Sequence, residues 1–125
     1  MTDLRALIDR YNEAWNRQDL DAICAMHAPD MVFENHNAGE RAVGEEVRTH
    51  IAEIFRNWPD LRFAGRSAYV GEDFLVQEWT ATATHPSGKQ VSWDGLDFFP
   101  IENGLIKRKD VYSNASRRVP EQLGE

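Results

Sequence analysis

The sequence predicts an α+β domain in which three N-terminal helices pack on the concave face of a strongly curved antiparallel sheet. Two observations carry this prediction. Apolar residues recur at helical spacing through the first half of the chain, and the spacing shortens toward two residues from Leu61 onward. The separators in the second half are short and contain glycine or proline, which forces consecutive strands to run antiparallel.

Helical signals come first along the chain. A second, shorter helix begins after Asp19 and is stopped by Pro29, whereas the third covers residues 47–58. Residues 31–35, between these two helices, form a short strand. The first helix follows Thr2 or Asp3 as its cap, and its apolar face carries Leu4, Leu7, Ile8, Tyr11 and Trp15.

Four strands are expected after the third helix, at residues 61–70, 74–85, 90–99 and 105–114. The last separator contains Asn103-Gly104, and Asn-Gly is a strong signal for a tight hairpin turn. These connections are too short for a parallel crossover, so the four strands form an antiparallel meander.

Length and composition indicate a single domain over residues 1–125, with a core at about 4–114 and a polar tail at 115–125. The net charge of −7 argues against nucleic acid and anionic membranes as partners. Cys24 is the single cysteine and no long apolar run is present, so a cytoplasmic location is expected. The histidine spacings match no metal site, and neither a metal nor a cofactor is expected.

Two carboxylates stand inside predicted strands. Asp97 lies in an aromatic run, and Asp110 lies in the next strand. Aspartate is depleted in strands, and a buried carboxylate is costly unless it is paired, hydrogen-bonded or protonated. The two positions therefore predict a polar site inside an apolar cup. Each also fits a structural role, in which the carboxylate bonds a neighbouring group, and for Asp110 that neighbour is Arg108.

Alternation along each strand groups the side chains that share a face. If these groups line the concave side, the small residues among them leave room for a ligand in a mostly apolar pocket. The groups are Trp93, Gly95, Asp97 and Phe99; Arg108, Asp110, Tyr112 and Asn114; and Trp79, Ala81 and Ala83.

Several local motifs resemble the SnoaL-like polyketide cyclases of the nuclear transport factor 2-like superfamily. The opening run YNEAWN at residues 11–16 is similar to the start of superfamily members. The runs WPDLRF at 58–63 and NGLI at 103–106, the latter leading into DVY at 110–112, resemble the SnoaL-like branch. The resemblance spans residues 4–114. It implies a cone-shaped fold with a deep apolar cavity, and many members of the superfamily are dimers.

The resemblance also implies roles for individual residues. Tyr11 and Asp97 fall where ketosteroid isomerases of this fold place two hydrogen-bond donors, a tyrosine and a protonated aspartic acid. Two such donors stabilise an enolate as its charge develops. Asn35 occupies the position of the general base in those enzymes. An amide does not accept a proton at neutral pH, so Asn35 is assigned to orienting the substrate.

Asp110 falls near the carboxylate with which epoxide hydrolases of this fold activate water. The arginine and aspartate with which those hydrolases complete their site would fall at Trp79 and Ala81, so the resemblance implies that this part of the hydrolase site is absent. SnoaL-type cyclases use one aspartate as acid and base in the same region. That aspartate aligns either with Asp110 or nearer to Ser113 or Asn114.

Two functions follow. The first is a cofactor-free enzyme that isomerises, cyclises or dehydrates a small apolar carbonyl compound, with Asp110 as general acid/base and Tyr11 and Asp97 polarising the carbonyl. The second is a non-catalytic binder of a small ligand, or a dimeric interaction module. A carboxylate of raised pKa away from any arginine would favour the enzyme, and two salt-bridged carboxylates would favour the binder.

Both functions place the same side chains around the ligand. The expected partners are a small apolar ligand and a second copy of the chain. The residues expected to contact the ligand are Asn35, Trp15, Phe33, Phe55, Trp79, Trp93, Phe99 and Tyr112.

Overall fold

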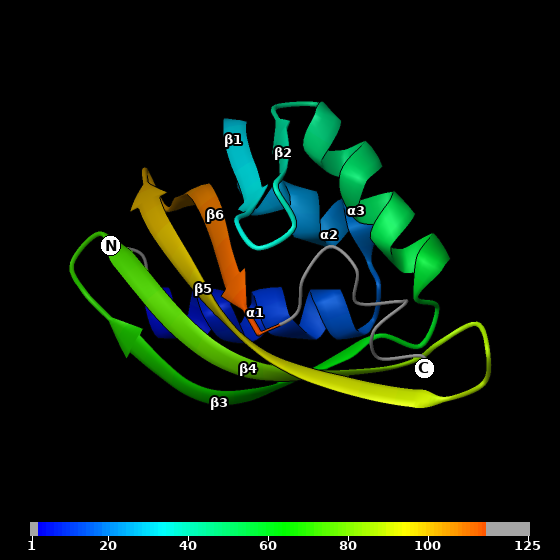
Figure 1. Ribbon diagram of the computed structural model, residues 1–125. Helices are drawn as coiled ribbons and strands as arrows, with labels where there is room; N and C mark the ends of the chain where they lie inside the picture. The colour runs from blue at the N-terminus through cyan, green and yellow to red at the C-terminus, as the bar shows by residue number, and fades with distance from the viewer. Residues whose placement is uncertain (1–2, 115–125) are drawn as a thin grey trace.

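The computed structural model describes residues 3–114, which form three helices and one six-stranded sheet (Figure 1). The polar tail predicted at 115–125 lies outside the described residues. The helices are α1 (Leu4–Asn16), α2 (Leu20–Ala25) and α3 (Glu46–Asn57). The strands are β1 (His27–Asn35), β2 (Glu40–Val43), β3 (Arg62–Val70), β4 (Phe74–Thr84), β5 (Gln90–Glu102) and β6 (Leu105–Ser113). They lie side by side in the order β2-β1-β6-β5-β4-β3.

The fold class predicted from the sequence is confirmed, with one difference in the direction of a strand. Strands β3 to β6 form the expected antiparallel meander, but β1 runs parallel to β6, so the sheet is mixed. Short connections determine direction only between consecutive strands. Most of the chain separates β1 from β6, and turn signals therefore leave their relative direction open.

The predicted hairpin between β5 and β6 is confirmed. Asn103 and Gly104 have φ angles of 54° and 76°, and two consecutive residues of positive φ match the twist of the flanking strands. The turn pairs Glu102 with Leu105 and sets the start of the β5–β6 ladder.

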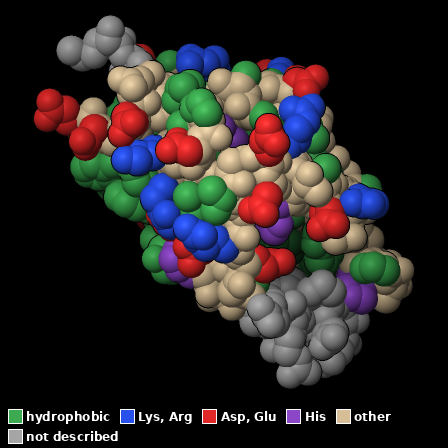
Figure 2. Space-filling model, turned by 90° about the horizontal axis from the view of Figure 1, so that it is seen from above, with side chains coloured by type: hydrophobic (Ala, Val, Ile, Leu, Met, Phe, Trp, Pro, Cys, Tyr) green, Lys and Arg blue, Asp and Glu red, His purple; other side chains and the backbone are tan. Residues whose placement is uncertain are grey.

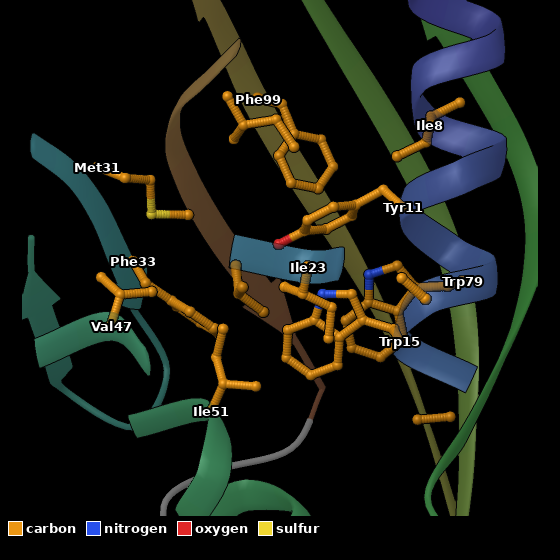
Figure 3. Close-up of a cluster of buried hydrophobic side chains, with 14 of the residues drawn as sticks. Ile8, Tyr11, Trp15, Ile23, Met31, Phe33, Val47, Ile51, Trp79 and Phe99 are labelled. Atoms are coloured by element: carbon orange, nitrogen blue, oxygen red, sulfur yellow. The ribbon is translucent and has the colours of Figure 1, made fainter. Parts of the chain in front are cut away.

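Helix α1 lies across the concave side of the sheet (Figure 1). Asp3 caps it by accepting hydrogen bonds from two backbone N–H groups of the first turn. At the other end, the side chain of Asn16 exchanges hydrogen bonds of 2.9 and 2.8 Å with the backbone of Phe63 in β3. These contacts hold Tyr11 and Trp15, which project from α1 into the core (Figure 3).

The core lies between the helices and the concave face of the sheet. Figure 3 shows side chains from α1, β1, α3 and β5 converging there, among them Tyr11, Phe33, Ile51 and Phe99. The ring of Tyr11 meets Phe99 edge to face, with centroids 5.5 Å apart. Edge-to-face aromatic pairs add a directional attraction to the burial of apolar surface, so the core fixes the orientation of α1 on the sheet.

Element boundaries differ from the prediction around β1. Helix α2 ends at Ala25 and β1 begins at His27, so Pro29 lies within a strand and does not end the helix. The pairing of β1 with β6 shifts register between His27 and Val32. An irregular stretch of this kind tolerates a proline, which has no N–H to donate to the ladder. Strand β2, four residues long, was not predicted.

The surface mixes both signs of charge. Acidic and basic side chains are interspersed over the face shown in Figure 2. None of the helices within residues 3–114 has both the length and the apolar character needed to cross a membrane.

Aromatic side chains also lie at the surface: Phe74, Phe98 and Tyr112 are 39%, 38% and 47% exposed. The expected homodimer stays a prediction.

Candidate functional site

A small pocket of about 90 Å³ lies on the concave side of the sheet, between α1, α3 and the strands. Pockets for drug-sized ligands measure roughly 300–1,000 Å³. This pocket therefore fits a small molecule, or one ring of a larger one. Its apolar lining comprises Trp15, Phe33, Ile54, Phe63, Trp79, Trp93 and Val111, and its polar lining comprises Asn35, Asp97 and Lys109.

Lys109 carries a buried amine into this pocket. Its Nζ lies 3.8 Å from the ring centroid of Trp15 and 5.0 Å from those of Tyr11 and Phe33, and the residue is only 6% exposed. Aromatic faces attract a cation, but no carboxylate forms a salt bridge with this amine within the described part of the chain. Burial lowers the pKa of Lys109 to about 8, and the nearby charge of Asp97 opposes that shift.

Asp97 brings a buried carboxyl group to the same pocket. The residue is 4% exposed, and its Oδ1 atom accepts no hydrogen bond from residues 3–114. Burial raises the pKa of Asp97, and the positive charge of Lys109 opposes this. The indole N–H of Trp79 also favours the charged form, although it is not placed to make a hydrogen bond of normal geometry.

Polar atoms left unpaired gather at this pocket. Besides Oδ1 of Asp97, they include the Nε1 atoms of Trp15 and Trp79, which have no partner among the described residues. Gln77 lies directly opposite Asp97 on β4, and its amide exchanges hydrogen bonds with Asn12. The fold thus satisfies the buried polar side chain next to Asp97 while the pocket atoms stay free. Buried polar groups are normally paired, so this cluster is a candidate functional site.

Lys109 faces the pocket because β6 contains a bulge. The register pairs Phe98 with Asp110 but Ile101 with Ile106, so β6 holds one more residue than β5 over this stretch. A bulge of this kind changes the direction of the side chains beyond it. Ile106 and Lys109 are consequently both buried, at 1% and 6% exposed, although they are three residues apart.

The prediction that Asp110 shares the concave face with Asp97 is wrong. Asp97 pairs with Val111, whereas Asp110 pairs with Phe98, so the two carboxylates lie on opposite faces of the sheet. A shift of one residue moves the whole alternating set to the other face. Tyr112, which shares the outer face with Asp110, is 47% exposed and lies outside the pocket as well.

On the outer face Asp110 belongs to a network of ion pairs. It accepts hydrogen bonds of 2.8 and 3.1 Å from Arg108 and lies 2.9 Å from Nε2 of His36. The Arg108 guanidinium, and then His36, hold the pKa of Asp110 below its usual range. Ligand atoms of Glu34, His36 and Asp110 lie within 4.8 Å of one another, as in a metal site. Arg108, however, already donates to both Glu34 and Asp110.

The hydroxyl of Tyr11 has a partner that the sequence did not predict. Its hydroxyl lies 2.9 Å from Nε2 of His27. Burial, and then the charge of Lys109, lower the pKa of His27 to about 3. This imidazole is therefore neutral at pH 7, and in the tautomer protonated on Nδ1 its Nε2 atom accepts a hydrogen bond from the Tyr11 hydroxyl. Tyr11 and Asp97 both line a narrow cavity next to the pocket, and the clamp of the two on one ligand oxygen stays a prediction.

Of the eight residues predicted to contact the ligand, five line the pocket and three do not. Phe55 packs on Trp15 with ring centroids 5.2 Å apart, and Phe99 is fully buried against Tyr11, so neither lines the pocket. Alternation along β6 from Val111, an apolar residue, was the signal that could have identified Lys109. The pocket is lined by the predicted Trp15, Phe33, Asn35, Trp79 and Trp93, and by the unpredicted Ile54, Phe63, Lys109 and Val111.

The space expected above Gly95 is filled by Trp79. The two residues are paired across β4 and β5, and a Cβ atom at Gly95 would lie 2.3 Å from the indole ring. The glycine therefore lets the indole lie flat against the strand. Its role is to position a wall of the pocket and not to enlarge it.

The model of the SnoaL-like domain matches residues 8–109 of this chain. Among solved structures, AclR from Streptomyces galilaeus, a proposed hydroxylase, is 26% identical to this chain, with a TM-score of 0.80. The match covers 96% of this chain and 83% of the AclR chain. A proposed SnoaL-like polyketide cyclase from Jannaschia sp. CCS1 is 19% identical, with a TM-score of 0.78 and coverages of 89% and 84%. A protein of ketosteroid isomerase-like fold from Catenulispora acidiphila DSM 44928, in complex with trimethylamine, is 16% identical, with a TM-score of 0.82 and coverages of 94% and 91%. No curated protein matches the chain by sequence.

Proposed function

Because the chain belongs to the SnoaL-like family, we propose that its pocket catalyses proton transfer beside the carbonyl group of a small, largely apolar compound. Similar structures are described as a hydroxylase and as a polyketide cyclase, so the fold alone does not select a reaction. The observation that supports proton transfer is Asp97, a buried acid with a free oxygen atom in the same pocket as the amine of Lys109.

Asp97 has the properties of a general acid/base. Burial raises its pKa, which brings it closer to neutral pH, where an acid/base catalyst is most effective. No arginine is among the residues that line the pocket. This is the arrangement expected of a catalytic pocket rather than of a simple binding pocket. In the proposal Asp97 replaces Asp110 as the group that removes a proton next to the carbonyl.

The negative charge that develops on the substrate oxygen needs donors. Lys109, whose pKa is about 8, is mostly protonated at pH 7 and supplies a positive charge without a carboxylate bound to it. The free indole N–H groups of Trp15 and Trp79 add two neutral donors. Oδ1 of Asn35 accepts from the backbone at 3.3 Å, which leaves its NH₂ group to orient the substrate. Donors fixed before the reaction stabilise an enolate most effectively.

Isomerisation, aldol-type cyclisation and dehydration all begin with this proton removal, so the test monitors that step alone. Cyclohexanone is incubated with the protein in D₂O, and loss of its α-hydrogens is followed by ¹H NMR. The wild type is expected to catalyse the exchange, and Asp97→Asn to slow it by about 10²- to 10⁴-fold.

Asp110→Asn is the matched control, because it removes a carboxylate from the opposite face and should leave exchange unchanged. Exchange that is as fast in Asp97→Asn as in the wild type contradicts the assignment of the base. Ketone binding without any exchange in the wild type supports the non-catalytic binder instead.

A further inference from the structure

The proton-transfer chemistry uses Lys109 only as a positive charge, yet its amine is a nucleophile whenever it is neutral. We propose that Lys109 also forms a covalent imine with aldehydes and unhindered ketones that enter the pocket, with Asp97 as the acid that releases water. The proposal rests on the proposed function, because it places the substrate carbonyl between the same two groups.

The surroundings of Lys109 differ from those of an ordinary surface lysine. Its Nζ is held against the Trp15 ring at 3.8 Å and has no carboxylate bound to it in the described structure. Lys107, two residues away on the outer face, donates a 3.1 Å hydrogen bond to Glu102, and its side chain is 50% exposed. The same strand thus carries one solvated, paired amine and one buried, unpaired amine.

Burial also keeps part of the Lys109 population unprotonated. With a pKa of about 8, roughly one amine in ten is neutral at pH 7, against fewer than one in a thousand for an unperturbed lysine. Desolvation in an apolar pocket is an established way to activate a lysine for imine formation. The free Oδ1 of Asp97 is available in the same pocket.

The step balances without a further reactant. The neutral amine attacks the carbonyl carbon and forms a C–N bond, and a proton passes from nitrogen to oxygen through the Asp97 carboxyl group. Asp97 then protonates the hydroxyl group of the carbinolamine, the C–O bond breaks, and water leaves. The neutral pair of Lys109 and Asp97 becomes an iminium cation beside a carboxylate, so charge is conserved and nothing is oxidised or reduced.

The pocket limits the size of the carbonyl compound. Its volume of about 90 Å³ and its aromatic walls suit one planar ring. Benzaldehyde meets this limit, and it has no hydrogen on the carbon next to its carbonyl. It therefore reports on imine formation and not on α-proton exchange.

Trapping the imine with hydride tests the proposal. The protein is incubated with benzaldehyde and sodium cyanoborohydride at pH 7, and the benzyl adducts are located by peptide mass spectrometry. The chain has only three lysines, Lys89, Lys107 and Lys109, so assignment is direct. Lys109 is expected to be labelled on the order of 10²-fold faster than either of the others, because about that much more of it is neutral at pH 7. Lys109→Met should lose this adduct, and Lys107→Met should keep it.

The outcomes separate the two proposals. Labelling confined to Lys89, Lys107 and the N-terminus overturns the imine at Lys109, whereas a Lys109 adduct that forms equally fast in Asp97→Asn overturns the role of Asp97 as the acid. If Lys109 is not labelled but cyclohexanone still exchanges its α-hydrogens, the non-covalent function survives and only the covalent step is wrong. If neither exchange nor labelling of Lys109 occurs, both proposals fail.

Discussion

Two carboxylates on neighbouring strands have opposite surroundings. Asp110 lies on the outer face, is bonded to Arg108 and His36, and has a lowered pKa. Asp97 lies on the concave face, has an oxygen atom without a partner among the described residues, and has a raised pKa. A satisfied ion pair is a structural feature, whereas an unsatisfied buried acid costs stability. The inner carboxylate, Asp97, is therefore the candidate for chemistry.

The neighbouring cations repeat the contrast. Arg108 donates to Glu34 and Asp110 on the outer face. The next residue, Lys109, points inward, with its amine against aromatic rings and in the same pocket as Asp97. Because successive residues of a strand face opposite sides, one dipeptide supplies both a structural cation and a candidate reactive one.

The largest expected effect is on catalysis. Lys109→Met removes the positive charge that would stabilise the enolate, and should slow α-hydrogen exchange of cyclohexanone by about 10²- to 10³-fold, the loss typical of an oxyanion donor. Arg108→Met removes the neighbouring cation and should leave the rate unchanged. If both variants lost the same fraction of the exchange rate, the effect of Lys109 would not depend on its position on the inner face.

The outer network should matter for stability instead. Arg108→Met leaves Asp110 largely buried without its guanidinium, and is expected to lower the free energy of unfolding by about 1–3 kcal/mol. Urea denaturation measures this, with the exposed Lys107→Met as control, for which a change within about 0.5 kcal/mol is expected. An Arg108→Met variant as stable as the control would show that the outer network is not structural.

Replacing the inner pair should have the opposite sign. The double variant Asp97→Leu/Lys109→Met exchanges two poorly paired buried charges for apolar groups, and should raise the unfolding free energy at pH 7 by about 1–3 kcal/mol. A fall in stability would mean that the pair stabilises the fold and is not held at a cost for function.

The pH dependence of stability should also distinguish the inner amine of Lys109 from the outer amine of Lys107, although by a smaller amount. The pKa of Lys109 is about 8 in the folded chain, against an ordinary lysine value of 10.5 in the unfolded chain. Between these two pH values the unfolded chain therefore binds more protons. Wild-type stability should therefore gain a rising contribution between pH 8 and 10.5. Urea midpoints across this range should show that contribution in Lys107→Met and not in Lys109→Met. Its presence in Lys109→Met would assign it to another group.

Much of the fold follows from residue patterns. Apolar spacing places the three helices, and the Asn103-Gly104 turn places the β5–β6 hairpin. The parallel pairing of β1 with β6 and the short strand β2 depend on contacts between distant segments. No local pattern encodes such contacts, because they join segments that are not neighbours in the sequence.

The candidate site, too, was predictable from the sequence only in part. Asp97 is recognisable from the sequence as a carboxylate in an aromatic strand. The face of β6 is not, because alternation counted from the apolar Ile106 turns Asp110 inward, while the bulge beyond Ile106 turns Lys109 inward instead. Because of one extra residue in β6, the concave face carries the amine of Lys109 in place of the predicted base, Asp110. The partner of Tyr11 was also hidden, since His27 belongs to a strand that the sequence placed in a helix.

The pKa of the Lys109 amine can be measured directly. With three lysines in the chain, ¹³Cε NMR of a lysine-labelled sample, compared with Lys109→Arg, identifies the Lys109 signal without ambiguity. A midpoint near pH 8, together with a change of that signal when a carbonyl compound is added, is the result expected of a buried amine facing a substrate pocket. A midpoint near 10.5, the ordinary value for lysine, with no response to carbonyl compounds, would show that the amine is not a buried group facing a substrate pocket.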